Sequence, residues 1–206
     1  GAEIFQYDYL NDDVTDFGEI DYSLSNKVPT ALRQAIADAK EGKKDAKPIL
    51  VLINPPYAES GSGIARGDAN KIGVEKTRIN GWMRELNVGY ASKELFTQFL
   101  IRIRHELPSA TLAMFSTLKY VNAPNFEPFR RVWQAKYLEG FVVHSRAFDG
   151  LEGDFPIGFL VWDTGTALPI SDVGVGVVDR FGNFIGEKQY VARPNNTLLN
   201  LWMAKT

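Results

Sequence analysis

The chain has 206 residues, of which 45% are hydrophobic and 23% charged, the balance of a soluble protein with one ordinary domain. It contains no cysteine, which excludes disulfides and thiol nucleophiles, and two histidines far apart in the sequence, so we expect no metal site. A formal net charge of -2 lacks the basic excess usual for a free-standing nucleic-acid binder, although a local patch would suffice. No secretory signal is evident, and no apolar run reaches the ~20 residues that span a bilayer. We expect a cytoplasmic enzyme or binding module without a membrane partner.

The first quarter of the chain predicts a strand, a helix and a second strand. Residues 4–10 have the composition of a short strand, and Pro29 suits the first turn of a helix. The aliphatic run Ile49–Ile53 is typical of a parallel strand that is covered on both faces. It ends at Asn54-Pro55-Pro56, because two prolines cannot continue a central ladder.

The middle of the chain alternates between irregular and periodic segments. Residues 58–92 are interrupted by glycines and are locally basic, which fits either contacts with DNA phosphates or a solvated loop. The clearest helix is predicted from Ser92, a plausible N-cap, to Glu106. Further expected elements are a strand at 111–116, a helix at 126–138, and strands at 141–144 and 157–162. The short loop between the last two strands predicts that the final one runs antiparallel.

The C-terminal part predicts a β-hairpin, residues 173–179 and 187–191, and a short apolar helix at 198–203. The order of elements predicts an α/β fold, a mostly parallel sheet with a final antiparallel strand. We divide the chain into a catalytic region, residues 1–165, and a C-terminal hairpin extension, residues 166–206.

The segment Asn54-Pro55-Pro56-Tyr57 occupies the position where α/β sheets bind ligands, directly after a strand. An exocyclic amine on adenine is a poor nucleophile, because its lone pair is delocalised into the ring. The side-chain oxygen of Asn54 and the carbonyl of Pro55 can accept hydrogen bonds from its two N–H groups and stabilise the positive charge that develops on the nitrogen. Tyr57 can stack on the base, a contact worth roughly 1–3 kcal/mol.

At this point the chain resembles the amino-methylating, adenine-specific DNA methyltransferases of restriction–modification systems, which use S-adenosylmethionine (AdoMet). The helix at 94–100, the strand end at 114–116, and the loop and strand at 146–150 and 155–162 are similar to that family's elements in the same order. The resemblance covers about residues 45–165. It implies a partial Rossmann-like fold, with DNA and a restriction or specificity subunit as partners. It assigns Asn54, Pro55, Pro56 and Tyr57 to catalysis, and Phe148, or its rival Phe155, to contact with the flipped base.

The chain departs from this family at the cofactor site. The acidic-aromatic-Gly-x-Gly loop that holds AdoMet is not found in the sequence. Asp8 looks like the acidic residue that ends a later strand on the cofactor side; the other interpretation is a turn-forming aspartate. We therefore expect a C-terminal portion of a larger methyltransferase, truncated or split, that does not bind AdoMet by itself.

Two other functions remain open from the sequence. Similar tetrapeptides occur in methyltransferases that act on RNA bases or on a protein glutamine, and a glutamine pocket is narrower and needs no second aromatic such as Phe148. The missing cofactor loop also fits a non-catalytic, methyltransferase-like binding domain.

Overall fold

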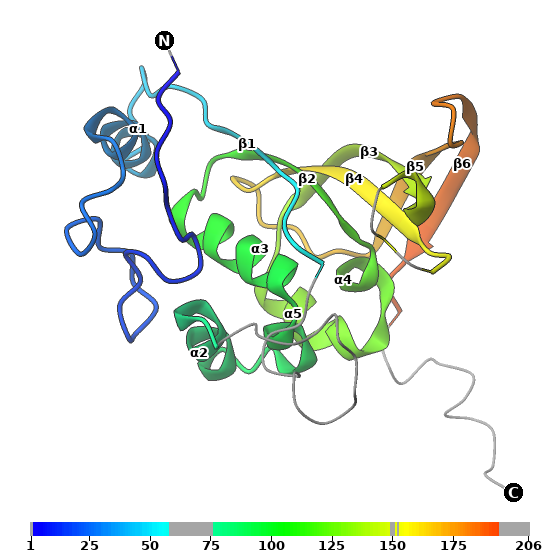
Figure 1. The fold of residues 1–206 in the computed structure, drawn as a ribbon, viewed down its shortest axis with the longest axis horizontal. Helices are drawn as coiled ribbons and strands as arrows, with labels where there is room; N and C mark the ends of the chain where they lie inside the picture. Colours follow the sequence, from blue (N-terminus) through cyan, green and yellow to red (C-terminus); the bar gives the residue numbers. More distant parts are fainter. Residues whose placement is uncertain (1, 58–75, 149–150, 152, 194–206) are drawn as a thin grey trace, which may run out of the picture.

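The computed structural model describes residues 2–57, 76–148, 151 and 153–193 (Figure 1). Its centre is a six-stranded sheet with the order β1-β2-β4-β3-β5-β6. The strands are β1 (Leu50–Ile53), β2 (Thr111–Thr117), β3 (Lys136–His144), β4 (Pro156–Asp163), β5 (Asp172–Val178) and β6 (Phe184–Val191).

The helices that follow the first strand lie on one side of the sheet, whereas the N-terminal segment and the first helix lie at its β1 end (Figure 1). The α-helices are α1 (Thr30–Lys40), α2 (Arg78–Glu85), α3 (Leu95–Glu106), α4 (Lys119–Asn122) and α5 (Glu127–Val132). Short 3₁₀ turns are η2 (Gly89–Lys93), η3 (Pro124–Phe126) and η4 (Ser145–Ala147). In the described part of the chain, no helix combines the length and apolarity needed to cross a bilayer.

The sheet is mixed. β1 pairs with β2, and β3 with β5, in parallel, whereas β4 runs antiparallel to both β2 and β3, and β6 runs antiparallel to β5. This confirms the α/β class and the antiparallel direction of the strand expected at 157–162, which lies inside the sheet between β2 and β3. β5 and β6 continue the same sheet beyond β3. The division at residue 165 stays a prediction.

The core lies between the sheet and the helices. β2 and β4 direct Leu112, Met114 and Trp162 toward the helices, where each is almost fully buried. The Trp162 indole packs against Trp133, with ring centroids 5.1 Å apart, and donates a hydrogen bond of 3.0 Å to the Tyr120 hydroxyl. Trp133 likewise donates to the Leu100 carbonyl, so these three aromatic residues bury their rings and still satisfy their polar atoms, which favours one well-ordered arrangement.

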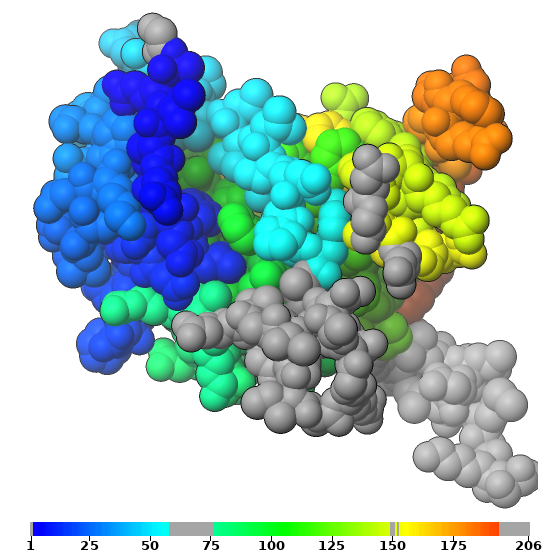
Figure 2. Space-filling view, in the orientation of Figure 1, coloured from blue at the N-terminus to red at the C-terminus, as the bar shows by residue number. Residues whose placement is uncertain are grey.

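β1 is covered on one face only, so the expectation of burial on both faces is wrong. Val51 and Ile53 pack toward the core, but Leu50 and Leu52 are 69% and 67% exposed. The reason is position, because β1 is the edge strand and the helices lie on the other side of the sheet. Figure 2 shows β1 and the residues next to it, in cyan, at the molecular surface.

The predicted strand at 4–10 is also wrong, because this segment has no regular structure and is held instead by α3. The guanidinium of Arg102, which is fully buried, donates to the carbonyls of Tyr9 and Asp12 and to the Tyr7 hydroxyl. Its Nε lies 3.0 Å from Oε2 of Glu106. Side-chain donors on α3 thus replace the ladder that a strand would have formed.

Several element boundaries also differ from the expectations. The helix expected at 126–138 is the shorter α5, because β3 already begins at Lys136. Ser92 lies in η2 and donates to the Gly89 carbonyl, so Glu94 takes the N-cap position of α3. α2 arises inside a segment expected to be irregular, with Thr77 accepting a hydrogen bond from the Asn80 amide as N-cap. The helix expected at 198–203 lies outside the described residues.

Candidate functional site

The tetrapeptide Asn54-Pro55-Pro56-Tyr57 leaves the sheet at the carboxyl end of β1. The last residue of this strand, Ile53, pairs with Met114 of β2, so the two parallel strands run toward the same edge of the sheet. Pro55 is buried, whereas Asn54 and Pro56 are exposed. A buried proline next to the strand end holds the backbone stiff and has no N–H to satisfy. The side chain and carbonyl of the first two residues are therefore presented from a rigid support.

Tyr57 is oriented by Asn54. Its hydroxyl donates a hydrogen bond of 2.9 Å to the Asn54 side-chain oxygen. Burial raises the pKa of Tyr57 to about 12, so the hydroxyl remains a neutral donor further into the alkaline range than an ordinary tyrosine does. The acceptor predicted to hold an amine N–H is thus already placed within hydrogen-bond distance of a donor.

Tyr57 forms part of the wall of a cavity of about 530 Å³, which we call the strand-end pocket. The wall comes from the loop after β1, the start of α3, the end of β2 with α4, the start of β4 and one residue of β6. The residues that line it are Tyr57, Glu94, Phe96, Thr117, Leu118, Lys119, Asn122, Ala123, Leu151, Phe155, Pro156 and Tyr190. Most of these side chains are apolar or aromatic, with a few polar groups, the usual composition of a small-molecule site.

A charged pair lies in the wall of this pocket. The ammonium of Lys119 is 2.7 Å from Oε1 of Glu94. The Glu94 side chain is only 4% exposed, whereas that of Lys119 is 46% exposed. Lys119 follows the end of β2, so it reaches the pocket from the strand next to the one that presents Asn54.

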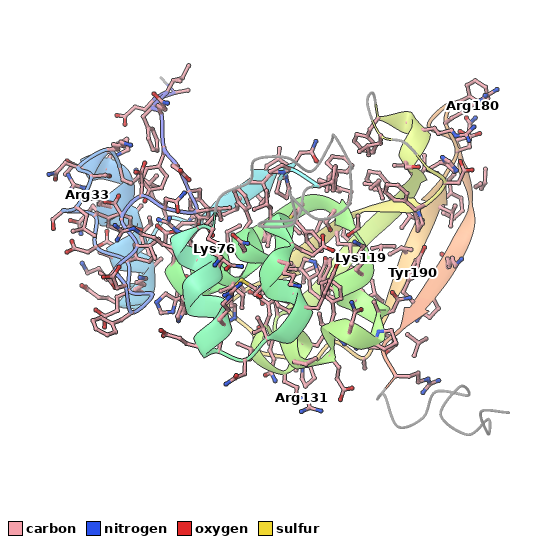
Figure 3. All side chains as sticks on the ribbon, turned by 60° about the horizontal axis from the view of Figure 1, so that its bottom comes forward. Arg33, Lys76, Lys119, Arg131, Arg180 and Tyr190 are labelled. Carbon is pink, nitrogen blue, oxygen red and sulfur yellow. The ribbon has the colours of Figure 1, made fainter. Side chains whose placement is uncertain are left out.

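The last strand also contributes to the pocket. Tyr190 of β6 is buried and lines the wall, and α4 contacts β6. Figure 3 shows Lys119 and Tyr190 near each other, on α4 and β6. Residues on both sides of the predicted boundary at 165 therefore form one cavity.

The structure brings some of the predicted site residues together and separates others. Phe155 lines the strand-end pocket with Tyr57. Phe148, its rival, packs edge-on against Phe115 of β2, with ring centroids 5.4 Å apart. Asp8 lies in a turn of the N-terminal segment, where its carboxylate accepts hydrogen bonds from the Leu10 amide and the Asn11 side chain. The roles given to these residues stay predictions.

The basic segment before α3 is partly described. Arg78 donates to the Val14 carbonyl and lies 3.6 Å from the Asp16 carboxylate, and the ammonium of Lys93 lies 5.8 Å from the Tyr90 ring. Arg66 and Lys71 lie outside the described residues.

Sequence reasoning missed Glu94, Lys119 and Tyr190. A signal existed for Lys119, because a charged residue directly after a strand that neighbours β1 is expected at the ligand-binding edge of the sheet. Glu94 gave a weaker signal as the residue that begins α3. Nothing local indicates Tyr190, which reaches the pocket only because the hairpin of β5 and β6 joins the sheet.

Comparisons with known proteins found no matching family model and no matching curated protein. Among solved structures, the chain is similar to the ATP-dependent Type ISP restriction-modification enzyme LlaBIII bound to DNA, at 8% identity and a TM-score of 0.41. It is also similar to the DrdV–DNA complex, at 12% identity and a TM-score of 0.41. The matches cover 68% and 71% of this chain but only 10% and 16% of those proteins. A likeness at these values assigns neither a family nor a function to this chain.

Proposed function

We propose that this chain forms the target-amine pocket of an adenine-specific DNA methyltransferase, which transfers a methyl group from AdoMet to the exocyclic amine of a flipped adenine. The observation that carries the proposal is the placement of Asn54-Pro55-Pro56-Tyr57. The segment lies at the carboxyl end of a parallel strand, and its tyrosine forms the wall of a cavity of about 530 Å³.

The tetrapeptide has the chemistry that an aromatic amine requires. The nitrogen of such an amine becomes positively charged as it forms its new bond, and acceptors fixed in advance stabilise that charge without reorganising. The Asn54 side-chain oxygen is such an acceptor, held 2.9 Å from the Tyr57 hydroxyl. In the proposed complex, an amine N–H replaces that hydroxyl, and the Pro55 carbonyl accepts the second N–H. The same acceptors then favour departure of a proton from the methylated nitrogen to solvent.

The size and walls of the pocket favour a base over an amino-acid side chain. Cavities that bind small molecules span about 300–1,000 Å³, and the strand-end pocket lies in that range. Tyr57 and Phe155 provide two aromatic rings in its wall. Taking a base out of the duplex costs a few kcal/mol, and stacking on an aromatic side chain offsets roughly 1–3 kcal/mol of it. A glutamine side chain has no ring to stack.

AdoMet enters the proposal as the methyl donor only. Asp8, the residue that the resemblance assigns to the cofactor, uses its carboxylate within its own turn and lies outside the strand-end pocket. Asp8 therefore does not present its carboxylate to a ligand in that pocket, and we assign no described residue to hold the cofactor.

The test is to express the protein, as its gene encodes it, in a host without N6-methyladenine. Wild type is compared with Asn54→Ala and with Gln34→Ala, an exposed amide on α1 that serves as control. Mass spectrometry of DNA, RNA and protein digests then measures each methylated product. We expect N6-methyladenine in DNA, unchanged by Gln34→Ala and lowered about 100-fold or more by Asn54→Ala, because one fixed acceptor is lost.

Circular dichroism shows whether the Asn54→Ala protein is folded. Undiminished DNA methylation in a folded Asn54→Ala protein contradicts the proposal. A methylated product found only in RNA or only on protein glutamine changes the substrate instead.

A further inference from the structure

The strand-end pocket contains a charged pair that neither the tetrapeptide nor its chemistry explains. Glu94 begins α3 and is almost fully buried, whereas Lys119 follows β2 and is about half exposed. A buried carboxylate is costly unless it is paired, so Glu94 fixes the position of the lysine head. The ammonium has three N–H donors, and Glu94 Oε1 accepts one of them at 2.7 Å. Because the side chain of Lys119 is 46% exposed and lines the cavity, the ammonium has donor capacity for a bound molecule.

We propose that Lys119, positioned by Glu94, determines which base the pocket accepts by donating a hydrogen bond to a ring nitrogen of that base. This inference rests on the proposed function. Asn54 follows β1, and Lys119 follows its parallel neighbour β2. Lys119 lines the strand-end pocket together with Tyr57, and the Tyr57 hydroxyl bonds the Asn54 side chain, so the two strand ends bring Lys119 and Asn54 to the same region. Asn54 and the Pro55 carbonyl are acceptors for the amine, and Lys119 is a donor. An aminopurine presents both partners, since its amine donates and its unsubstituted ring nitrogens accept.

The surroundings of the pair favour a neutral ring over a phosphate. Glu94 balances the charge of Lys119, so the pair as a whole attracts an anion less than a free lysine would. The walls of the pocket also include apolar side chains. Phe96 and Leu118 are buried, and Ala123 is partly buried. A hydrogen bond from a charged donor gains strength in such a setting, and leaving that donor unpaired against an analogue without the acceptor is costly.

The experiment is an NMR titration of the intact protein with adenosine and with its 1-, 3- and 7-deaza analogues, each of which replaces one ring nitrogen by CH. The variant is Glu94→Gln/Lys119→Met, which removes the donor without leaving a buried charge unpaired. Lys136→Met, at the exposed start of β3 and outside the pocket, is the matched control. Glu94→Gln alone tests positioning, since it keeps the donor but releases it.

We expect the double variant to bind adenosine about tenfold more weakly than wild type, and Lys136→Met to bind it equally well. One deaza analogue is expected to bind wild type about tenfold more weakly than adenosine does. For the double variant, the same analogue and adenosine are expected to have equal affinities. Glu94→Gln is expected to reduce that discrimination. A loss of folding cannot produce this pattern, because it would weaken all four ligands together.

The inference is overturned if the double variant binds adenosine as tightly as wild type does. It is also overturned if no deaza analogue that binds wild type more weakly than adenosine binds the double variant as tightly as adenosine. It is also overturned if the variant loses affinity for adenosine 5′-monophosphate but not for adenosine, which would place the lysine on the phosphate. The proposed function fails separately. In that case Asn54→Ala and Tyr57→Ala leave adenosine binding unchanged. A wild type that binds no adenosine at all overturns the inference about Lys119 as well.

Discussion

The two ends of α3 carry two ion pairs that differ in what surrounds them. At the C-terminal end, Arg102 is fully buried, and its donors are taken by Glu106, the Tyr7 hydroxyl and two backbone carbonyls of the N-terminal segment. At the N-terminal end, the ammonium of Lys119 is about half exposed and lies beside a cavity. The Arg102 guanidinium donates its hydrogen bonds within the chain, whereas the Lys119 ammonium can also donate to a ligand.

This contrast indicates how one helix serves both stability and function. Tyr22 adds a hydrogen bond of 2.5 Å to Oε1 of Glu106, and burial, followed by the Glu106 charge, raises the pKa of Tyr22 well above its usual value. We call Arg102, Glu106 and their hydrogen-bond partners the anchor. Its donors and acceptors are used within the chain, and the Tyr22 hydroxyl stays protonated. The cost of damaging it falls on folding, while damage at the pocket end falls on binding.

The largest effect is expected from Arg102→Met. Removing this guanidinium leaves the buried Glu106 carboxylate without its ion-pair partner and the carbonyls of Tyr9 and Asp12 without this donor, which costs about 3–5 kcal/mol in the free energy of unfolding. Urea denaturation followed by circular dichroism measures it. Arg131→Met is the control, because Arg131 pairs with Glu127 at the surface and is expected to change stability by less than about 1 kcal/mol. Equal effects of the two variants would refute the anchor role.

Charge-neutral double variants sharpen the contrast. Arg102→Met/Glu106→Gln removes both charges but still deprives the carbonyls of Tyr9 and Asp12 of their donor, so we expect a loss of about 2 kcal/mol or more. Glu94→Gln/Lys119→Met removes one hydrogen bond, whose lysine is about half exposed, and its expected loss is smaller, about 1 kcal/mol. Denaturation under the same conditions compares them. A pocket variant as unstable as the anchor variant would show that both pairs are structural.

Removal of one hydroxyl tests the anchor more gently. Tyr22→Phe keeps the ring but takes a donor from the buried Glu106 carboxylate, which is expected to cost about 1–3 kcal/mol. Thermal unfolding monitors this as a lower midpoint. If the midpoint does not move, the hydrogen bond contributes nothing net and the anchor depends on Arg102 alone.

The smallest effect on stability is expected from Tyr57→Phe at the pocket end, within about 0.5 kcal/mol at neutral pH. This substitution is expected to change the free energy of unfolding mainly at alkaline pH. Because the folded pKa of Tyr57 is raised to about 12, folding retains a proton that the unfolded chain loses near its ordinary value of 10.0. Wild type therefore loses stability between these pH values, and Tyr57→Phe loses less. Denaturation at pH 8 and pH 11 measures the difference, and identical slopes would contradict the raised pKa.

The pattern of residues along the chain predicted much of the sheet. The strands at 111–116, 157–162 and 173–179 appear within one residue of their expected bounds, and the strand at 187–191 begins three residues earlier, at Phe184. The tetrapeptide was placed correctly after β1, because two prolines end a ladder by local chemistry alone. The failures share a different origin. Residues 4–10 have the composition of a strand, yet Arg102, about ninety positions later, supplies the hydrogen bonds that decide their structure.

What the sequence determined by itself was therefore local: the alternation of elements, the stiff loop that presents Asn54 and the aromatic character of Tyr57. Periodicity and turn chemistry act over a few residues and need no partner. Only the tertiary structure decided that β1 is bare on one face, that Phe155 rather than Phe148 lines the strand-end pocket, and that Glu94 and Lys119 meet. Such contacts depend on which strand ends lie side by side, and the order of strands in the sheet is set by packing across the whole molecule.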